Sequence, residues 1–235
     1  MKKFASFFAV FLFITLFAVA SEAGDRNIPV EVAQLTDSLK KQFAPDRRVA
    51  LLDVDYSFSD KNVMLRGVTT SAEAKNALLK ELARKGYAVM DCLELLPDVK
   101  GLEGKTCGII NVSVANMRVA PDFSSEMMTQ SLMGMPVRVL QRDGWVRIQT
   151  PDNYIAWVHR VGVHPVTEEE MAAWNKAEKI VVTAHYGFVY SEPNQTSQTV
   201  SDVVAGNRLK WEGSKGAFYK VTYPDGRRGY ISKSI

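Results

Sequence analysis

Thiol and imidazole groups are the side chains of this 235-residue chain from which covalent or metal chemistry could start, and it has two cysteines and three histidines. A nucleophilic cysteine needs a histidine base within reach, and in papain-like enzymes it opens a helix. Cys92 instead lies in residues 87–95, which predict a strand, and Cys107 stands at a predicted domain boundary. The histidines do not have the sequence spacing that is typical of zinc ligands. They stand at His159, His164 and His185. We therefore expect no catalytic site, metal site or cofactor on this chain.

The first twenty residues have the layout of a secretory signal peptide. Lys2 and Lys3 precede an almost wholly apolar run over residues 4–19, and small residues at 18–20 offer a cleavage site. A retained membrane anchor is the alternative, although the apolar run is slightly short for a membrane span. No other segment is apolar and long enough to cross a bilayer. We therefore expect an exported protein, periplasmic or secreted, with no stable membrane span after signal removal.

The charge of the chain argues against two classes of partner. Cleavage after residue 20 would remove two of the 29 basic residues, which would leave them close in number to the 26 acidic ones. A nearly neutral mature chain has no general attraction for nucleic acid or for anionic lipid. We expect neither as a partner.

Cys92 and Cys107 form an even pair in a chain that is expected to be exported, which favours a disulfide between them. This bridge would close a loop of about 15 residues and stabilise the fold by about 3 kcal/mol in the chain-entropy model. Two buried or free thiols are the alternative.

Residues 27–100 predict a small α+β domain with the order α-β-β-α-β. The expected helices span residues 31–43 and 71–85, and the expected strands span residues 49–58, 62–68 and 87–95. The stretch from Val63 to Val68, followed by a helix that contains Ser71 and Lys75, resembles a BON-type domain. That resemblance implies an envelope protein, in some cases one that binds phospholipid surfaces. A plain α+β spacer is the alternative.

After Gly108 the chain consists of short β runs separated by turns, and these runs repeat. The five residues from Met117 match those from Val189, and the six from Gly134 match those from Gly206, both at an offset of 72. A third pair of segments, beginning at Tyr154 and Arg227, matches at an offset of 73. A repeat that keeps its register from end to end indicates two copies of one unit.

We place these copies at residues 108–165 and 179–235, with a helical connector over residues 166–178 between them. Each copy resembles a bacterial SH3 (SH3b) domain. In the first copy the marks are a Gly-x-Pro-Val strand at Gly134, the segment from Gly144 to Ile148, and a Pro-Asp-Asn turn at residues 151–153. The resemblance implies that five short strands close into a barrel. The predicted fold class is therefore mainly β, with two tandem SH3b barrels preceded by the α+β domain.

The first copy has a narrower resemblance. Residues 125–130 (Ser-Glu-Met-Met-Thr-Gln), residues 133–137 and residues 149–154 are similar to the first SH3b domain of NlpC/P60 cell-wall cysteine peptidases of the dipeptidyl-peptidase VI type. In that family two SH3b domains precede a papain-like catalytic domain, and the first recognises the free amino terminus of the L-Ala-γ-D-Glu stem peptide. No such catalytic domain follows before Ile235, so we expect either a fragment or a catalytically empty relative.

The same resemblance supplies candidate ligand-binding residues. It places the family's acidic residue at Glu126 and its turn aromatic at Tyr154, and Trp157 lies on the strand that follows. A carboxylate pairs with an α-ammonium group, and a phenol can hydrogen-bond the same group. A solvated loop glutamate and a tyrosine that only covers the barrel edge are the alternatives, and Trp157 could serve packing alone.

These features predict an exported module that recognises peptidoglycan stem peptides and targets the cell wall. It would work with an NlpC/P60 catalytic domain, either C-terminal to it or separate. An envelope protein–protein interaction module is the alternative, with Phe123, Met127 and Met128 as its contact patch. Association with a lipid surface through residues 31–97 is a third and weaker hypothesis.

Overall fold

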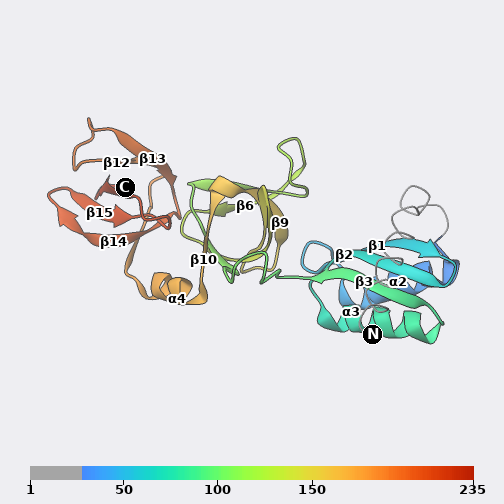
Figure 1. The fold of residues 1–235 in the computed structure, drawn as a ribbon. Helices are drawn as coiled ribbons and strands as arrows, with labels where there is room; N and C mark the ends of the chain where they lie inside the picture. Colours follow the sequence, from blue (N-terminus) through green and yellow to red (C-terminus); the bar gives the residue numbers. More distant parts are fainter. Residues whose placement is uncertain (1–27) are drawn as a thin grey trace, which may run out of the picture. The chain divides into compact units, whose positions relative to one another are not determined.

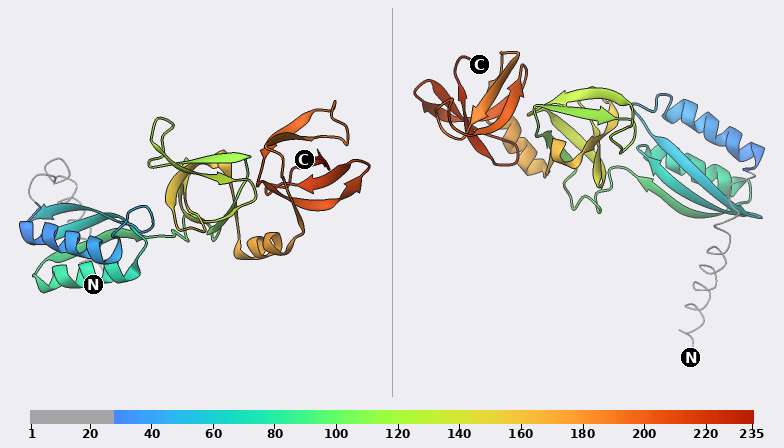
Figure 2. Two further views of the ribbon diagram at one scale, coloured as in Figure 1. Left: turned by 180° about the vertical axis from the view of Figure 1, so that it is seen from behind. Right: turned by 90° about the horizontal axis from the view of Figure 1, so that it is seen from above.

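The computed structural model describes residues 28–235, which form two compact units (Figures 1 and 2). The first unit ends at Leu96 and the second begins at Pro97. The predicted signal peptide over residues 1–20 lies outside the described residues. Within the described part of the chain, no helix has both the length and the apolar character needed to span a membrane.

The first unit is a three-stranded sheet with two helices. Its elements are α2 (Val30–Phe43), β1 (Leu52–Ser59), β2 (Asn62–Thr69), α3 (Ala72–Arg84) and β3 (Ala88–Leu95). The sheet order is β1-β2-β3, with an antiparallel β1–β2 hairpin and a parallel β2–β3 pair that α3 connects. The Ser71 hydroxyl begins α3 by accepting a hydrogen bond from Ala74 N at 3.0 Å. The predicted α-β-β-α-β order is confirmed.

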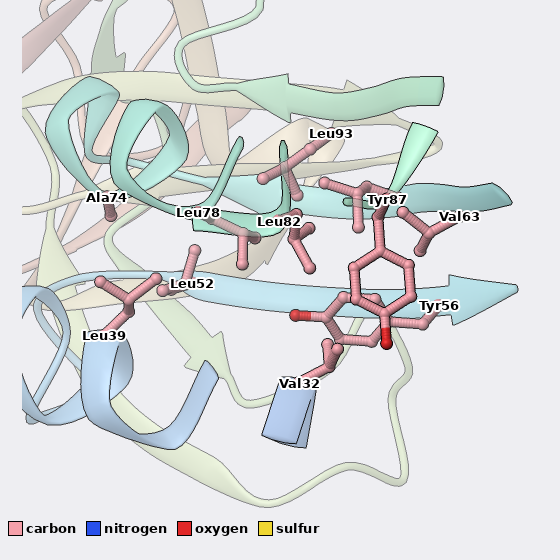
Figure 3. Close-up of a cluster of buried hydrophobic side chains, with 11 residues drawn as sticks. Val32, Leu39, Leu52, Tyr56, Val63, Ala74, Leu78, Leu82, Tyr87 and Leu93 are labelled. Carbon is pink, nitrogen blue, oxygen red and sulfur yellow. The ribbon is translucent and has the colours of Figure 1, made fainter. Parts of the chain in front are cut away.

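The core of this unit lies between the two helices and one face of the sheet (Figure 3). Leu52 and Tyr56 of β1 point to it at alternate positions, as the two-residue period of a strand requires. The Tyr56 hydroxyl hydrogen-bonds Thr36 of α2, and burial raises the pKa of that phenol. The BON-type resemblance of this unit stays a prediction.

The second unit holds the repeat. The first copy comprises β4 (Cys107–Ile110), β5 (Val114–Arg118), β6 (Met127–Leu132), β7 (Pro136–Asp143), β8 (Trp145–Gln149), β9 (Ile155–His159), the 3-10 helix η1 (Arg160–Gly162) and β10 (Val163–Val166). The second comprises β11 (Lys179–Val181), β12 (Tyr186–Tyr190), β13 (Thr199–Val204), β14 (Arg208–Lys215), β15 (Phe218–Thr222) and β16 (Arg228–Ser232). We call them the first and the second barrel.

The two barrels have the same strand topology. The first has the order β10-β4-β7-β8-β9-β5-β6, and the second has β11-β14-β15-β16-β12-β13. The two orders correspond strand by strand, except that the first barrel has the additional edge strand β10. Even the irregularities correspond. A bulge between Val139 and Gln141 has its counterpart between Trp211 and Gly213, and one at Met117/Arg118 has its counterpart at Val189/Tyr190. Bulges at matching positions show that the sequence repeat is a repeat of structure.

Helix α4 (Glu168–Lys176) follows the first barrel and packs against it. Its N-terminus has a capping box, in which Thr167 and Glu170 each bond the other's backbone N–H. Met171 and Trp174 bury one side of the helix against Ile109 and Val166 of the first barrel, and the Trp174 indole N–H donates to Gly134 O at 3.2 Å. The predicted connector is therefore a packed helix.

The first barrel also contributes to the core of the second. Met133 is fully buried among residues of the second barrel, including Val182 and Leu209. The next residue, Gly134, has a φ of +83°, and a Cβ there would lie 2.3 Å from the backbone oxygen of Arg208. Glycine is therefore required at this close approach between the barrels.

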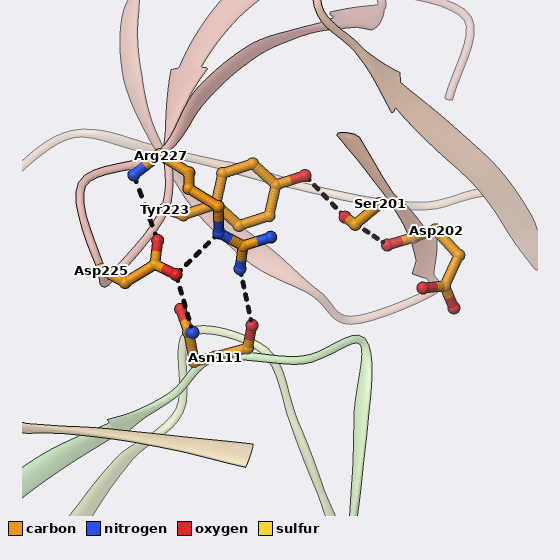
Figure 4. A network of polar contacts seen from close by, with 6 residues as sticks. All are labelled: Asn111, Ser201, Asp202, Tyr223, Asp225 and Arg227. Atoms are coloured by element: carbon orange, nitrogen blue, oxygen red, sulfur yellow. Dashed lines mark hydrogen bonds and ion pairs between the residues drawn. The ribbon is translucent and has the colours of Figure 1, made fainter. Parts of the chain in front are cut away.

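Polar contacts join the barrels beside these apolar ones (Figure 4). The Asn111 amide donates to Asp225 Oδ2 at 2.9 Å, and the Arg227 guanidinium donates to the same oxygen at 2.6 Å and to Asn111 O at 3.3 Å. Nearby, the Ser113 hydroxyl donates to Asp202 at 2.6 Å, and the buried Asn207 donates to Ser113 O at 2.8 Å. Together these contacts fix the two barrels against each other.

Candidate functional site

Glu126 ends a loop over residues 119–126 that is held by its own hydrogen bonds. Val119 N donates to Glu126 O at 3.1 Å, and the Arg118 guanidinium donates to Ser125 O at 2.6 Å. Hydrogen bonds from the backbone and hydroxyl of Ser124, both 2.6 Å long, hold the pKa of the Asp122 carboxyl below its ordinary value. The loop is thus a formed structure that presents Glu126 at the start of β6.

The Glu126 side chain is exposed at this position. Its carboxylate makes no hydrogen bond and no ion pair with any of the described residues. A charged group with no internal partner, on a fixed loop, can bind a cation of a ligand without first breaking a contact.

Tyr154 follows the turn between β8 and β9. Thr150 closes this turn, because its N–H donates to Tyr154 O at 3.0 Å and its hydroxyl accepts from Tyr154 N at 3.0 Å. Asn153 takes the left-handed conformation that the turn needs, with a φ of +70°. The Tyr154 ring is partly buried, and its hydroxyl has no hydrogen-bond partner among the described residues. The turn therefore orients the ring and leaves the phenol available to a ligand.

Trp157 lies on the outer face of β9, opposite Arg118 of β5 and Arg147 of β8 in the strand register. The Arg147 guanidinium carbon lies 5.1 Å from the centre of the Trp157 ring, within cation–π range. Part of the Trp157 surface is therefore used within the barrel, which agrees with the packing role kept open from the sequence.

The three predicted residues share a region of the first barrel but do not touch. Because β9 runs antiparallel to β5, Tyr154 lies toward the end of β5 at which the loop over residues 119–126 begins. Within residues 28–235, no hydrogen bond or ring contact joins Glu126, Tyr154 and Trp157 to one another. A bound peptide would have to bridge them.

An aromatic cluster that was not predicted from the sequence lies next to this region. Phe123 of the loop packs on Trp145 and His159, with ring centres 4.9 and 5.1 Å apart, and 67% of Phe123 stays exposed. Trp145 lies in the segment from Gly144 to Ile148 that marks the resemblance in sequence, but only the fold shows that the Phe123 ring packs on it.

The second barrel lacks the loop carboxylate and the turn aromatic at the equivalent positions. The backbone bond from Val119 to Glu126 recurs between Ser191 and Gln198, so an amide replaces the carboxylate. Arg227 stands where the first barrel has Tyr154, and it is held at the interface between the barrels by Asp225. The candidate site therefore belongs to the first barrel alone.

Both cysteines are free thiols in this structure, so the predicted disulfide is not formed in it. Cys92 is an exposed residue of β3 in the first unit, and Cys107 begins β4 in the second unit. Burial, and then the charge of Glu168, raise the pKa of the Cys107 thiol. Pairing of Cys92 with Cys107 stays a prediction for the oxidised protein.

The two barrels share one strand order, to which the first adds β10, and together they define a protein built on a pair of SH3-type barrels. Comparison with protein-family models agrees. Residues 117–161 match the bacterial dipeptidyl-peptidase Sh3 domain, and residues 185–234 match the bacterial SH3 domain. The chain therefore carries two bacterial SH3 domains in tandem, the first of the dipeptidyl-peptidase type, and the recognition of this region from sequence is confirmed.

Comparison with solved structures gave matches to NlpC/P60 proteins. One from Bacillus cereus ATCC 10987 is 20% identical with a TM-score of 0.45, and the match covers 55% of this chain and 54% of that one. An NlpC/P60 endopeptidase from Photobacterium damselae subsp. piscicida is 12% identical with a TM-score of 0.41, over 88% of this chain and 42% of that one. The chain thus spans about half of the length of the Bacillus protein it matches. Comparison with curated proteins gave no match.

Proposed function

We propose that this chain is an exported cell-wall recognition module whose first barrel binds the free amino terminus of peptidoglycan stem peptides that begin with L-Ala-γ-D-Glu. One observation carries the proposal. The Glu126 carboxylate is exposed and has no partner among the described residues, and it lies within the segment that matches the dipeptidyl-peptidase Sh3 domain family.

The chemistry of the three residues supports this assignment. The Glu126 carboxylate accepts charge-assisted hydrogen bonds from the peptide's α-ammonium group. The Tyr154 phenol adds a hydrogen bond, and Trp157 offers a flat apolar face to the first side chain of the peptide. Because the Arg147 guanidinium already covers part of the Trp157 ring, we assign Trp157 a smaller contribution to peptide binding than Glu126 or Tyr154.

The module would direct a cysteine peptidase of the NlpC/P60 type to its substrate, with the catalytic domain either on the same polypeptide or on a separate one. The chain would supply recognition and no catalytic group. Export to the periplasm or the outside of the cell, through the signal peptide at residues 1–20, would bring the module to the cell wall.

Isothermal titration of the chain with the tripeptide L-Ala-γ-D-Glu-diaminopimelate tests the proposal. We expect a dissociation constant in the micromolar to millimolar range, and Glu126→Gln should weaken it about tenfold, which corresponds to about 1.4 kcal/mol. N-acetylation of the peptide should abolish binding, because it removes the ammonium group.

Glu192→Gln is the matched control, since Glu192 is an exposed carboxylate on the corresponding loop of the second barrel. It should leave the affinity unchanged. Equal binding of the free and N-acetylated peptides by the wild-type chain would refute an ammonium-binding role for Glu126.

An envelope protein partner is the second candidate, because two apolar side chains of the first barrel are well exposed. Phe123 is 67% exposed and Met127 is 50% exposed, on the loop and the strand on either side of Glu126. This candidate predicts that Phe123→Ser abolishes capture of a partner from envelope extracts, and that added stem peptide does not compete with the partner.

A further inference from the structure

A cavity of 440 Å³ lies where the two barrels meet. Strand β6 and the β8–β9 turn of the first barrel form one wall, and Gly206 and Arg208 of the second barrel form the other. Small-molecule sites in proteins have volumes of roughly 300–1,000 Å³, so the cavity has the size of such a site. Its walls are held in place by the contacts between the barrels, which include a backbone hydrogen bond from Arg208 N to Met133 O at 2.9 Å.

Ser131 of β6 lines this cavity and is only 5% exposed. Its hydroxyl makes no hydrogen bond with any of the described residues. This oxygen is not one of the fully buried polar atoms that lack a partner, so it retains some surface that a ligand in the cavity can reach. The neighbouring Thr150 hydroxyl, in contrast, already accepts a hydrogen bond from Tyr154 N at 3.0 Å. The Ser131 hydroxyl is therefore available to a molecule that fills the cavity.

Two opposite charges also line the cavity, one from each barrel. Asp152 comes from the β8–β9 turn and Arg208 from the start of β14, and both are exposed. Neither side chain makes an ion pair or hydrogen bond within residues 28–235. A cavity with one free carboxylate, one free guanidinium and a buried hydroxyl matches a ligand that carries both a carboxylate and an ammonium group.

We propose that this junction cavity is a second binding site, for a free amino acid or a dipeptide with both termini uncapped. Arg208 binds the carboxylate, the Ser131 hydroxyl donates a second hydrogen bond to it, and Asp152 binds the ammonium group. The inference goes beyond the proposed function, because it uses neither Glu126 nor Tyr154 and requires both barrels together.

Titration of the ¹⁵N-labelled full chain with the dipeptide L-Ala-L-Ala, followed by NMR, tests the proposal. The expected amide shift changes lie at Ser131, Thr150 and Gly206. Arg208→Gln should weaken binding of the dipeptide about tenfold. The C-terminal amide of the dipeptide should bind the wild-type chain about tenfold more weakly than the free acid, and Arg208→Gln should not weaken it further.

Arg228→Gln is the matched control, because Arg228 is an exposed arginine of the same barrel outside the cavity. Ser131→Val is the second variant, with an expected loss of about threefold. Glu126→Gln should leave the affinity for L-Ala-L-Ala unchanged. The test of this cavity is therefore independent of the test of the proposed stem-peptide site. Shift changes confined to other regions, no saturable binding up to millimolar dipeptide, or equal behaviour of Arg208→Gln and Arg228→Gln would each overturn the proposal.

Discussion

Glu126 and Gln198 occupy the same place in two copies of one fold, and both accept the same backbone hydrogen bond through their carbonyl oxygens. The side chains have nearly the same shape, but only Glu126 carries a negative charge, so an ammonium group would distinguish the two loops. The motif around Glu126 supplied it as a candidate from the sequence, and its role in binding stays a prediction. The sequence could not predict that the Glu126 carboxylate has no partner. Its neighbours Ser124 and Ser125 are hydrogen-bonded to Asp122 and Ala120 instead, and only the structure shows these bonds.

Tyr223 is the buried residue for which the structure gives a defined pH dependence. Burial raises the pKa of its phenol from 10.0 to about 12, although hydrogen bonding to Ser201 opposes the shift. Because the pKa in the folded chain lies above that in the unfolded chain, this stabilisation is complete below pH 10 and is lost as the pH rises toward 12. We expect the free energy of unfolding, measured with urea, to fall by about 2 kcal/mol over this range.

Tyr223→Phe should remove this dependence and cost about 1 kcal/mol at pH 8, since the hydrogen bond to Ser201 is lost. Tyr186→Phe is the control, because Tyr186 is 58% exposed. Parallel pH profiles of Tyr223→Phe and the wild type would show that another group is responsible.

At the scale of single elements, the β6–β7 turn has two separate constraints at Gly134, its backbone conformation and the approach of Arg208. Gly144, between β7 and β8, has a similar positive φ of +68° but open space around its Cβ position. We therefore expect Gly144→Ala to cost about 1 kcal/mol for the conformation alone. Gly134→Ala should cost about 2 kcal/mol more, because the added methyl group also displaces the second barrel.

Urea unfolding of both variants, each compared with the wild type, measures this difference. The same cost for both substitutions would mean that the barrels can separate at Gly134 without loss of stability.

Helices and strands of this chain were well predicted, because each carries its own periodicity and its own start and stop signals. The connector over residues 166–178, for example, was predicted to be helical, and α4 lies within it with a capping box at Thr167. What α4 packs against could not be predicted in the same way. Met171 and Trp174 show that one side of the helix is apolar, but the surface they bury against includes Ile109, which is distant from the helix in sequence.

At the scale of the whole molecule, ionisation of Asp225 makes the stability of the contact between the barrels depend on pH. Burial opposes its charge, but hydrogen bonds from Asn111 and Arg227 outweigh that effect and hold the pKa of Asp225 below its ordinary value of 3.8. The stabilisation is therefore complete above that value and is lost as the pH falls through the lower pKa of the folded chain. We expect the melting temperature of the wild type to approach that of Asp225→Asn as the pH falls from 5 to 2.

Asp152→Asn is the control for this comparison, because Asp152 makes no ion pair within the described residues. A gap between wild type and Asp225→Asn that stays constant across this pH range would contradict the assignment of the charge to the interface.

The repeat in the sequence predicted the fold that the two barrels share. It could not predict the interface between them, because a repeat reports only what the copies have in common. Part of the interface uses positions at which the copies differ. Met133 is buried in the second barrel, whereas its counterpart Ala205 is exposed, and Arg227 replaces Tyr154. An alignment of the two copies treats such positions as variation, although they determine the contact.

The burial of Met133 in the neighbouring barrel bears on how this protein could evolve. Tandem small domains are commonly gained, lost and exchanged one at a time, because each carries its own core. Here the first barrel supplies Met133 to the core of the second, so a gene that acquired the second barrel alone would encode a domain with a void at the position of this methionine. We therefore expect the two barrels to be inherited as a pair.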